Sequence, residues 1–199
     1  MVLTQPRPGC RRPLEPVVAE CVAAGADAIQ LRDKTADSRA LVATVARLRA
    51  ITEPAGAVLI VNDRLDVALA AGADGVHLGP DDLPLAAARD IAPPPFLIGY
   101  STDDPDDARR AAADGADYLG VGAVFGTRSK PGLADEAIGP GQVRAVREAS
   151  RLPCLGIGGI TPGNAAIVFA TGAGVAVLSA VMAAPDPSTV VHALLRSAG

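Results

Sequence analysis

The chain has 199 residues, of which 49% are hydrophobic and 20% charged, and its formal net charge is −4 at pH 7. This size is typical of one globular domain, and we predict a single domain over residues 1–199. The small negative charge argues against a basic surface for nucleic acid or anionic membranes, so we expect neither as a partner. No stretch reaches the roughly 20 apolar residues of a membrane span, and the N-terminus lacks the apolar core of a signal peptide. We therefore expect a soluble, cytoplasmic protein.

Apolar runs and turn signals predict eight strands that alternate with helices. In chain order, we expect the strands at residues 2–4, 28–31, 58–61, 75–78, 96–99, 118–121, 154–157 and 175–178. We expect the helices at residues 14–24, 38–52, 64–71, 83–91, 105–114, 141–149, 164–170 and 187–197. The strand segments are continuously apolar, which is typical of parallel strands that are covered on both faces.

A Gly-Ala turn followed by a short apolar strand occurs four times in the chain. The copies are residues 25–31 (GADAIQL), 72–78 (GADGVHL), 115–121 (GADYLGV) and, in degraded form, 172–178 (GAGVAVL). They recur roughly every 50 residues with one further apolar run between them, which is the spacing of two βα units per repeat. Four such repeats predict an α/β fold, a (β/α)8 TIM barrel. An open doubly wound sheet is built from the same units and is the alternative, but the even repetition favours the barrel.

Two carboxylates follow neighbouring predicted strands. Asp63 comes after the strand at 58–61, and Asp82 comes after the strand at 75–78. In a barrel the C-terminal ends of the strands share one face, so these side chains are expected to converge. Oxygen ligands without a His or Cys cluster favour Mg²⁺, which binds one or two carboxylates together with substrate phosphate and water. Each residue alone is also a good helix N-cap, but the pair favours a metal site.

Cations are expected at the same face. The chain has 16 arginines but only two lysines, Lys34 and Lys130, and both lysines lie just beyond predicted strands. Arg32 and Lys34 follow the second strand, and Lys130 follows the sixth. A ring of cations around two carboxylates suits a magnesium diphosphate better than a neutral sugar. A salt-bridged surface is the alternative interpretation.

A second anion site is expected after the last two strands. The cluster at 156–160 (GIGGI) follows the seventh strand, and Leu178 and Ser179 end the eighth. In TIM barrels these loops often bind a phosphate through backbone N–H groups at the start of a short helix, although tight turns also need glycine. Thr127 and Ser129 lie between the two sites, and residues 129–137 are a candidate lid. His77 lies within the fourth strand and is expected to be a buried structural residue.

With these residues identified, the chain resembles the thiamine-phosphate synthase family along almost its whole length. The family's motifs are similar, in order, to residues 30–34 (QLRDK), 62–63 (ND), 79–82 (GPDD), 99–101 (GYS), 123–130 (AVFGTRSK) and 156–160 (GIGGI). Three positions depart from the family pattern: Asp103 stands where the family has His, Gly126 where it has Pro, and Gln5 where Asp is common.

The resemblance implies a transferase that joins hydroxymethylpyrimidine diphosphate to thiazole monophosphate and releases diphosphate. Mg²⁺ on Asp63 and Asp82 would stabilise the leaving diphosphate, together with three catalytic cations. The resemblance implies the following further roles: catalytic Arg32, Lys34 and Lys130; pyrimidine-binding Gln30, Asn62 and Ser101; and thiazole-phosphate-binding Thr127, Ser129, Gly159, Leu178 and Ser179. Substrate binding is also expected of the three cations. The oligomeric state is left open, with a homo-oligomer as one option.

Three other functions compete with this hypothesis. The sister thiazole tautomerase shares the barrel, but its chemistry calls for a His where this chain has Asp103, and it has no evident use for the carboxylate pair. A Schiff-base aldolase would use Lys34 or Lys130 and would leave both carboxylates idle. A non-catalytic phosphate-binding barrel would not need metal ligands.

Overall fold

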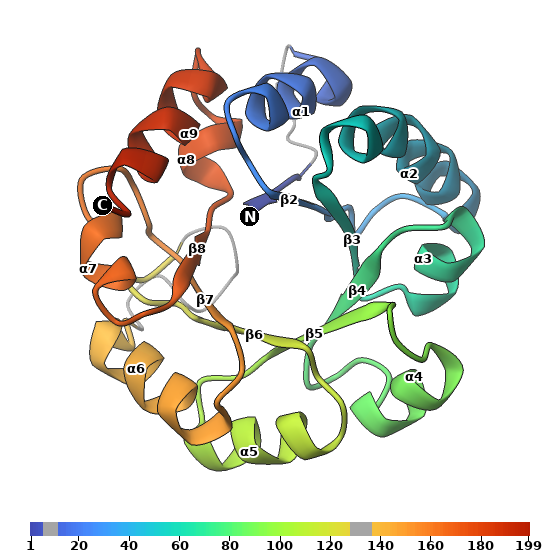
Figure 1. Cartoon of the computed structure of the whole chain (residues 1–199). Coiled ribbons are helices and arrows are strands. Elements are labelled where there is room, and N and C mark those ends of the chain that lie inside the picture. The colour runs from blue at the N-terminus through green and yellow to red at the C-terminus, as the bar shows by residue number, and fades with distance from the viewer. Residues whose placement is uncertain (6–11, 128–136) are drawn as a thin grey trace.

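The computed structural model describes residues 1–5, 12–127 and 137–199, and it contains one parallel sheet in which the strand order follows the chain (Figure 1). The strands are β1 (Val2–Leu3), β2 (Ala28–Leu31), β3 (Val58–Asn62), β4 (Gly75–Leu78), β5 (Leu97–Ser101), β6 (Tyr118–Gly122), β7 (Cys154–Ile157) and β8 (Gly174–Ala176). The helices are α1 (Leu14–Ala23), α2 (Ser38–Thr52), α3 (Leu65–Ala71), α4 (Leu85–Ile91), α5 (Pro105–Ala113), α6 (Gly139–Ser150), α7 (Ala165–Phe169), α8 (Ser179–Met182) and α9 (Pro187–Arg196), with a 3-10 turn at Glu53–Ala55. The helices form a ring around the strands, as Figure 1 shows.

The first and last strands close the sheet into a barrel. Val2 forms a parallel bridge with Val177. The backbone N–H of Leu3 donates to the Val177 carbonyl at 2.8 Å, and the N–H of Val177 donates to the Met1 carbonyl at 3.1 Å. These bonds exclude the open doubly wound sheet and confirm the predicted TIM barrel.

Most element boundaries agree with the sequence prediction to within two residues, and two short elements were missed. The strand predicted at 96–99 runs instead from Leu97 to Ser101. The unpredicted elements are α8, between β8 and α9, and the 3-10 turn after α2. Elements of three or four residues are shorter than the window in which hydrophobic periodicity can be recognised.

The strand side chains alternate between the helix layer and the barrel interior. Ile29, Leu59 and Leu119 belong to the hydrophobic core that the strands share with the helices. Because successive side chains on a strand point to opposite faces, their neighbours face the interior. The interior neighbours include the polar residues Gln30 and Tyr118, so part of the interior is not a hydrophobic core.

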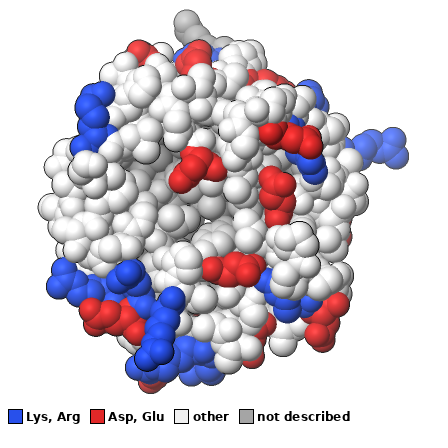
Figure 2. Space-filling model, viewed as in Figure 1, with Lys and Arg blue, Asp and Glu red and all other residues white. Residues whose placement is uncertain are grey.

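Figures 1 and 2 look along the barrel axis at the N-terminal ends of the strands. In Figure 1 the strands follow one another clockwise around the barrel in chain order. Because β-α-β crossovers are right-handed, this order means that the N-terminal ends of the strands point toward the viewer. Figure 2 shows a hollow at the centre of this end, with acidic side chains around it and Lys and Arg side chains at the periphery. The ends of the strands that are expected to carry the chemistry lie on the opposite face.

The aspartates of the repeated Gly-Ala-Asp turns hold the N-terminal end of the barrel together. The Asp74 carboxylate accepts a hydrogen bond from the N–H of Leu59 at 2.7 Å, and the Asp117 carboxylate accepts one from the N–H of Ile98 at 2.7 Å. Each aspartate, at the start of one strand, therefore binds a backbone N–H of the preceding strand. In the degraded fourth copy Gly174 takes the place of the aspartate.

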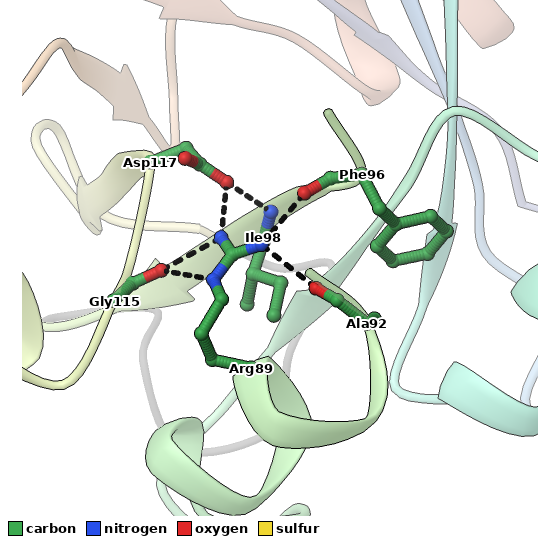
Figure 3. A network of polar contacts seen from close by, with 6 residues as sticks. All are labelled: Arg89, Ala92, Phe96, Ile98, Gly115 and Asp117. Atoms are coloured by element: carbon green, nitrogen blue, oxygen red, sulfur yellow. Dashed lines mark hydrogen bonds and ion pairs between the residues drawn. The ribbon is translucent and has the colours of Figure 1, made fainter. Parts of the chain in front are cut away.

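Arg89 ties helix α4 to this end of the barrel (Figure 3). Its guanidinium donates to the carbonyls of Ala92, Phe96 and Gly115 at distances of 2.7–3.0 Å, and it pairs with the Asp117 carboxylate at 2.6 Å. The Arg89 side chain is only 17% exposed. One side chain thus donates to three loop carbonyls and forms an ion pair with a carboxylate that also accepts the N–H of Ile98.

We predict that Arg89→Met lowers the free energy of unfolding by roughly 2–3 kcal/mol, because it leaves a partly buried carboxylate without its cation and several carbonyls without this donor. Urea denaturation monitored by circular dichroism would measure this loss. The matched control is Arg110→Met, since Arg110 pairs with Asp107 at 3.1 Å on α5 but is 64% exposed. The control should lose less than about 1 kcal/mol. Equal losses in the two variants would contradict the role assigned to Arg89.

Candidate functional site

The parallel register brings the expected site residues to one rim of the barrel. In the β3–β4 pairing, Asn62 lies beside His77 at the C-terminal ends of both strands. Arg32 and Lys34 follow β2, Asp63 follows β3, and Ser101 ends β5. The backbone N–H of Arg32 donates to Thr4 Oγ1 at 3.2 Å, which fixes the start of the loop after β2.

Asp63 and Asp82 converge as the sequence predicts. The two carboxylates are within hydrogen-bonding reach of each other, and Lys34 Nζ lies 3.1 Å from Asp63 Oδ2. Asp82 also accepts a hydrogen bond from the N–H of Gly79 at 2.7 Å. Burial raises the pKa of the Asp82 carboxyl, and the neighbouring Asp63 charge raises it further, although the Gly79 N–H opposes the rise. Two acidic groups therefore share one small, partly buried locus.

Neither carboxylate caps a helix. The residue before α3 is Arg64, and the residue before α4 is Pro84; neither of these helix starts has a side-chain cap. Asp63 instead adopts a left-handed backbone conformation with φ 64°. This conformation is uncommon for a residue other than glycine, but aspartate tolerates it better than most. The alternative interpretation of both residues as N-caps is thus excluded.

The donor set at this locus fits Mg²⁺. In the described ranges, no group of three or more His, Cys, Asp or Glu residues could hold a metal ion by itself. Mg²⁺ commonly takes only one or two protein carboxylates and completes its octahedron with waters and substrate phosphates. A divalent cation between Asp63 and Asp82 would also relieve the repulsion between two like charges. The pair is therefore suited to a cation that arrives with a phosphorylated substrate.

A chain of polar side chains crosses the barrel interior beneath this rim. His77 Nδ1 lies 3.0 Å from the Tyr118 hydroxyl, and His77 Nε2 lies 2.8 Å from Ser101 Oγ. The Gln30 side chain lies next to the Tyr118 phenol, and Gln30 Nε2 donates to Met1 Sδ at 3.6 Å. Gln30 is 3% exposed and His77 9%, whereas Ser101 is exposed at the rim. Burial lowers the pKa of His77 to about 4 and raises the pKa of Tyr118, so both side chains are neutral near pH 7.

Two glycines make room for this chain. A Cβ on Gly99 would lie 2.1 Å from Tyr118 Cζ and 2.5 Å from His77 Nδ1. A Cβ on Gly120 would lie 3.0 Å from His77 Cε1. The two rings thus pass over strand positions that no larger residue could occupy without moving them.

The sequence prediction described His77 correctly as buried, but it missed Tyr118 and the contact between the two side chains. Tyr118 lies 41 residues from His77, and nothing local relates the two. The available signal was the period of two along β5 and β6, which places Gly99 and Ser101, and Tyr118 and Gly120, on the same face of the sheet.

The loops after β6 and β7 pack closely on each other. Gly159 has φ 65°, and a Cβ there would lie 2.7 Å from the Gly126 carbonyl and 2.8 Å from the Phe125 carbonyl. Glycine at position 159 is therefore required both by its backbone conformation and by this close approach. Thr127 is half-buried on the same β6 loop, Leu178 is half-buried before α8, and Ser179 is exposed at its first residue. Ser129, Lys130 and almost all of the candidate lid at 129–137 lie outside the described residues.

Asp103 borders a cavity of about 430 Å³ beside this loop cluster. The cavity is also lined by Ile138 and Gln142. The Gln142 side chain donates to the Asp103 backbone carbonyl at 2.6 Å, while the Asp103 side chain is exposed. Asp103, one of the three departures from the family pattern, is thus held through its backbone carbonyl at the edge of this cavity.

A family model described as "Thiamine monophosphate synthase" matches residues 1–181. The chain belongs to this family. It is therefore a transferase of thiamine biosynthesis, as the sequence motifs predict. Thiamine-phosphate synthase from Natronomonas pharaonis is 51% identical over 184 residues, covering 92% of this chain and 85% of the relative. The enzyme of the same name from Moorella thermoacetica is 49% identical over 187 residues, covering 94% and 89% of the two chains.

Solved structures agree with this assignment. A thiamine phosphate pyrophosphorylase from Pyrococcus furiosus superposes on this chain with a TM-score of 0.88 at 39% sequence identity. The match covers 99% of this chain and 94% of the solved chain. A 3-hexulose-6-phosphate synthase superposes with a TM-score of 0.68 at 20% identity, covering the whole of both chains, and shows the shared fold alone. Over the described ranges, no helix of this family member combines the length and hydrophobicity needed to cross a membrane.

The lowered pKa of the buried His77 makes the free energy of unfolding depend on pH. Its pKa is about 4 in the folded chain and about 6.5 when unfolded, so between these values the unfolded state binds the additional proton. The free energy of unfolding should therefore fall as the pH drops from 6.5 toward 4, by up to about 1.4 kcal/mol per pH unit. Urea denaturation at pH 7.0, 6.0 and 5.0 would measure the slope.

His77→Gln should flatten this slope, because it removes the titrating group. The control is His192→Gln, since His192 is the other histidine of the chain and is exposed on α9. A steep slope that survives in His77→Gln, or one that disappears in His192→Gln, would contradict the assignment.

Proposed function

We propose that this chain transfers the hydroxymethylpyrimidine group from its diphosphate to thiazole monophosphate, giving thiamine phosphate and diphosphate in a Mg²⁺-dependent reaction. The observation that carries the proposal is the Asp63–Asp82 pair beside Lys34, at the same rim as the polar interior chain. A magnesium diphosphate needs carboxylates for the cation and ammonium or guanidinium groups for the phosphates. Membership of the thiamine monophosphate synthase family indicates which substrates would bind at these carboxylates and cations.

In the proposed mechanism, Asp63 and Asp82 would hold Mg²⁺, which would supply positive charge next to the leaving diphosphate. Arg32, Lys34 and Lys130 add positive charge around the same oxygens. The bond between the pyrimidinylmethyl carbon and the diphosphate oxygen breaks with both electrons passing to oxygen. The thiazole nitrogen then donates its lone pair to the resulting pyrimidinylmethyl cation. No proton has to be removed by the enzyme, so electrostatic stabilisation of the departing diphosphate supplies most of the catalysis.

We assign the remaining residues to the two substrates. We assign Gln30, Asn62 and Ser101 to the pyrimidine substrate, because they lie where the polar interior chain meets the rim of the barrel. The thiazole phosphate would be held by Thr127, Ser129, Gly159, Leu178 and Ser179. The close packing of the Gly159 loop on the Phe125 and Gly126 carbonyls supports one continuous pocket wall there. We place the reaction in the cytoplasm, where both substrates are soluble.

The structure argues against Lys34 as a Schiff-base lysine. A Schiff base needs a neutral amine, which enzymes obtain by burying the lysine in an apolar pocket or placing it beside another cation. Lys34 is instead 59% exposed and paired with the Asp63 carboxylate. Both features favour its charged form, which suits a diphosphate ligand.

The proposal is tested by a direct assay of the purified protein with Mg²⁺, hydroxymethylpyrimidine diphosphate and thiazole monophosphate. We expect thiamine phosphate and diphosphate to appear in equal amounts, and to disappear when EDTA is added. Heat-denatured protein is the background control. A folded protein that binds thiazole monophosphate but forms no product with Mg²⁺ would refute the synthase function.

We predict that Asp63→Asn reduces kcat/KM at limiting Mg²⁺ by at least about tenfold, with partial recovery at high Mg²⁺, because it weakens the hold on the cation. The change should leave the fold intact, since asparagine tolerates the left-handed backbone of position 63 as well as aspartate does. Mg²⁺ titrations of the initial rate would measure the effect.

The matched control is Asp66→Asn, since Asp66 is exposed on the next helix and pairs with Arg64 outside the site. This control should keep the wild-type dependence on Mg²⁺. An unchanged Mg²⁺ dependence in Asp63→Asn would remove Asp63 from the metal site.

A further inference from the structure

Asp33 stands between Arg32 and Lys34, two of the cations expected to bind the diphosphate, and it is not itself part of the proposed mechanism. A carboxylate at this point would by its charge alone oppose the binding of an anion. The structure shows that the loop itself uses the side chain. One oxygen, Asp33 Oδ1, accepts hydrogen bonds from the N–H of Thr35 at 2.9 Å, from the Thr35 hydroxyl at 2.8 Å and from the N–H of Ala36 at 3.1 Å.

These bonds close a turn around Lys34. The accepting side chain belongs to the residue before Lys34, and the donors belong to the two residues after it. Aspartate commonly orders irregular backbone in this way, by accepting N–H groups two or three residues further along the chain. The backbone of Lys34 is therefore fixed from both sides.

The turn is anchored to the body of the barrel at both ends. Before it, the N–H of Arg32 donates to Thr4 Oγ1 at 3.2 Å, and Thr4 is only 1% exposed. After it, Ala36 packs against the hydrophobic core. Between these anchors Lys34 is 59% exposed, and its Nζ lies 3.1 Å from Asp63 Oδ2. The loop thus presents an exposed cation from a backbone that is held in place.

We propose that Asp33 is a positioning residue, which orders the loop after β2 and so places the Lys34 ammonium to bind the diphosphate of the substrate. This inference rests on the proposed function for the identity of that substrate. A lysine side chain loses much conformational freedom when it is immobilised on binding, and an ordered backbone reduces the part that remains to be lost. This gain outweighs the repulsion between the Asp33 charge and the diphosphate.

Two substitutions separate the charge of Asp33 from its hydrogen bonds. Asp33→Asn removes the charge but keeps a side-chain carbonyl oxygen that can accept from Thr35 and Ala36. Asp33→Ala removes both the charge and the acceptor. A residue that acted through its charge alone would give the same gain in diphosphate binding in both variants, because each removes one negative charge. A positioning residue predicts that only Asp33→Ala loses binding.

The matched control is Asp37→Ala, in the same connection between β2 and α2. Asp37 Oδ1 also accepts a backbone N–H, that of Ala40 at 2.8 Å, and so caps helix α2. The control changes the net charge by the same amount as Asp33→Ala and removes a hydrogen bond of the same kind, but that bond lies outside the turn around Lys34. Asp37→Ala should lower the midpoint of urea denaturation and leave the kinetic constants unchanged.

The first readout is the initial rate of thiamine phosphate formation. Asp33→Ala should lower kcat/KM for hydroxymethylpyrimidine diphosphate roughly fivefold and leave the KM of thiazole monophosphate unchanged, whereas Asp33→Asn should keep at least the wild-type values. Asp33→Ala combined with Lys34→Met should be no worse than Lys34→Met alone, because Asp33 acts through Lys34. Equal rates in Asp33→Ala and Asp33→Asn, an equal loss in Asp37→Ala, or a loss that adds to that of Lys34→Met would overturn the proposal.

The second readout does not depend on catalysis. In calorimetric titrations with inorganic diphosphate in excess Mg²⁺, binding should be weakened by a similar factor in Asp33→Ala and not in Asp33→Asn or Asp37→Ala. If the wild-type protein forms no thiamine phosphate but shows this pattern, the proposed function fails and the positioning role stands. If thiamine phosphate forms but the pattern is absent from both readouts, the positioning role fails and the synthase function stands. A wild-type protein that forms no product and binds no magnesium diphosphate would refute both.

Discussion

The backbone hydrogen bonds between β1 and β8 are the constraint on which the rest of the structure depends. They close eight parallel strands into one ring, so the C-terminal end of every strand reaches the same rim. Lys34, Asp63 and Asp82 lie on the loops after β2, β3 and β4, and the parallel pairing of these neighbouring strands brings them within contact distance. An open sheet of the same units would leave the loops after β2 and β7 on distant edges, and the two expected anion sites could not share one pocket.

Contacts that stabilise the fold lie at the N-terminal end of the barrel, and the candidate site residues lie at the C-terminal end. At the N-terminal end, Asp74 and Asp117 bind backbone N–H groups of the preceding strands, and Arg89 gathers loop carbonyls around Asp117. These are fully matched donors and acceptors, which lower the free energy of the folded chain. At the C-terminal end, Asp63 has a left-handed backbone and Asp82 faces a like charge, with Lys34 as a compensating cation. Such unfavourable features persist where binding or catalysis requires them.

The interior chain links these two ends. Gln30 and His77 are buried and Tyr118 is half-buried. The cost of burying these polar groups is offset by the contacts of His77 with Tyr118 and Ser101 and of Gln30 with Met1, and a partly satisfied set would be worse than an apolar interior. Gly99 and Gly120 leave the space that the rings of His77 and Tyr118 occupy, because a Cβ at either position would lie too close to them. The result is a rigid support whose only exposed member, Ser101, faces the rim where the substrate is expected.

The sequence by itself determined the fold and the family, because these depend on local and repeated patterns. The four Gly-Ala turns, the continuous apolar strands and the order of the motifs were sufficient to predict a TIM barrel and the convergence of Asp63 and Asp82. Only the tertiary structure decided that these carboxylates are not helix caps, that α8 follows β8, and that Tyr118 reaches His77 across 41 residues. The physical reason is that inward-facing contacts in a barrel join strands that are distant along the chain, and no local sequence pattern records which of them meet.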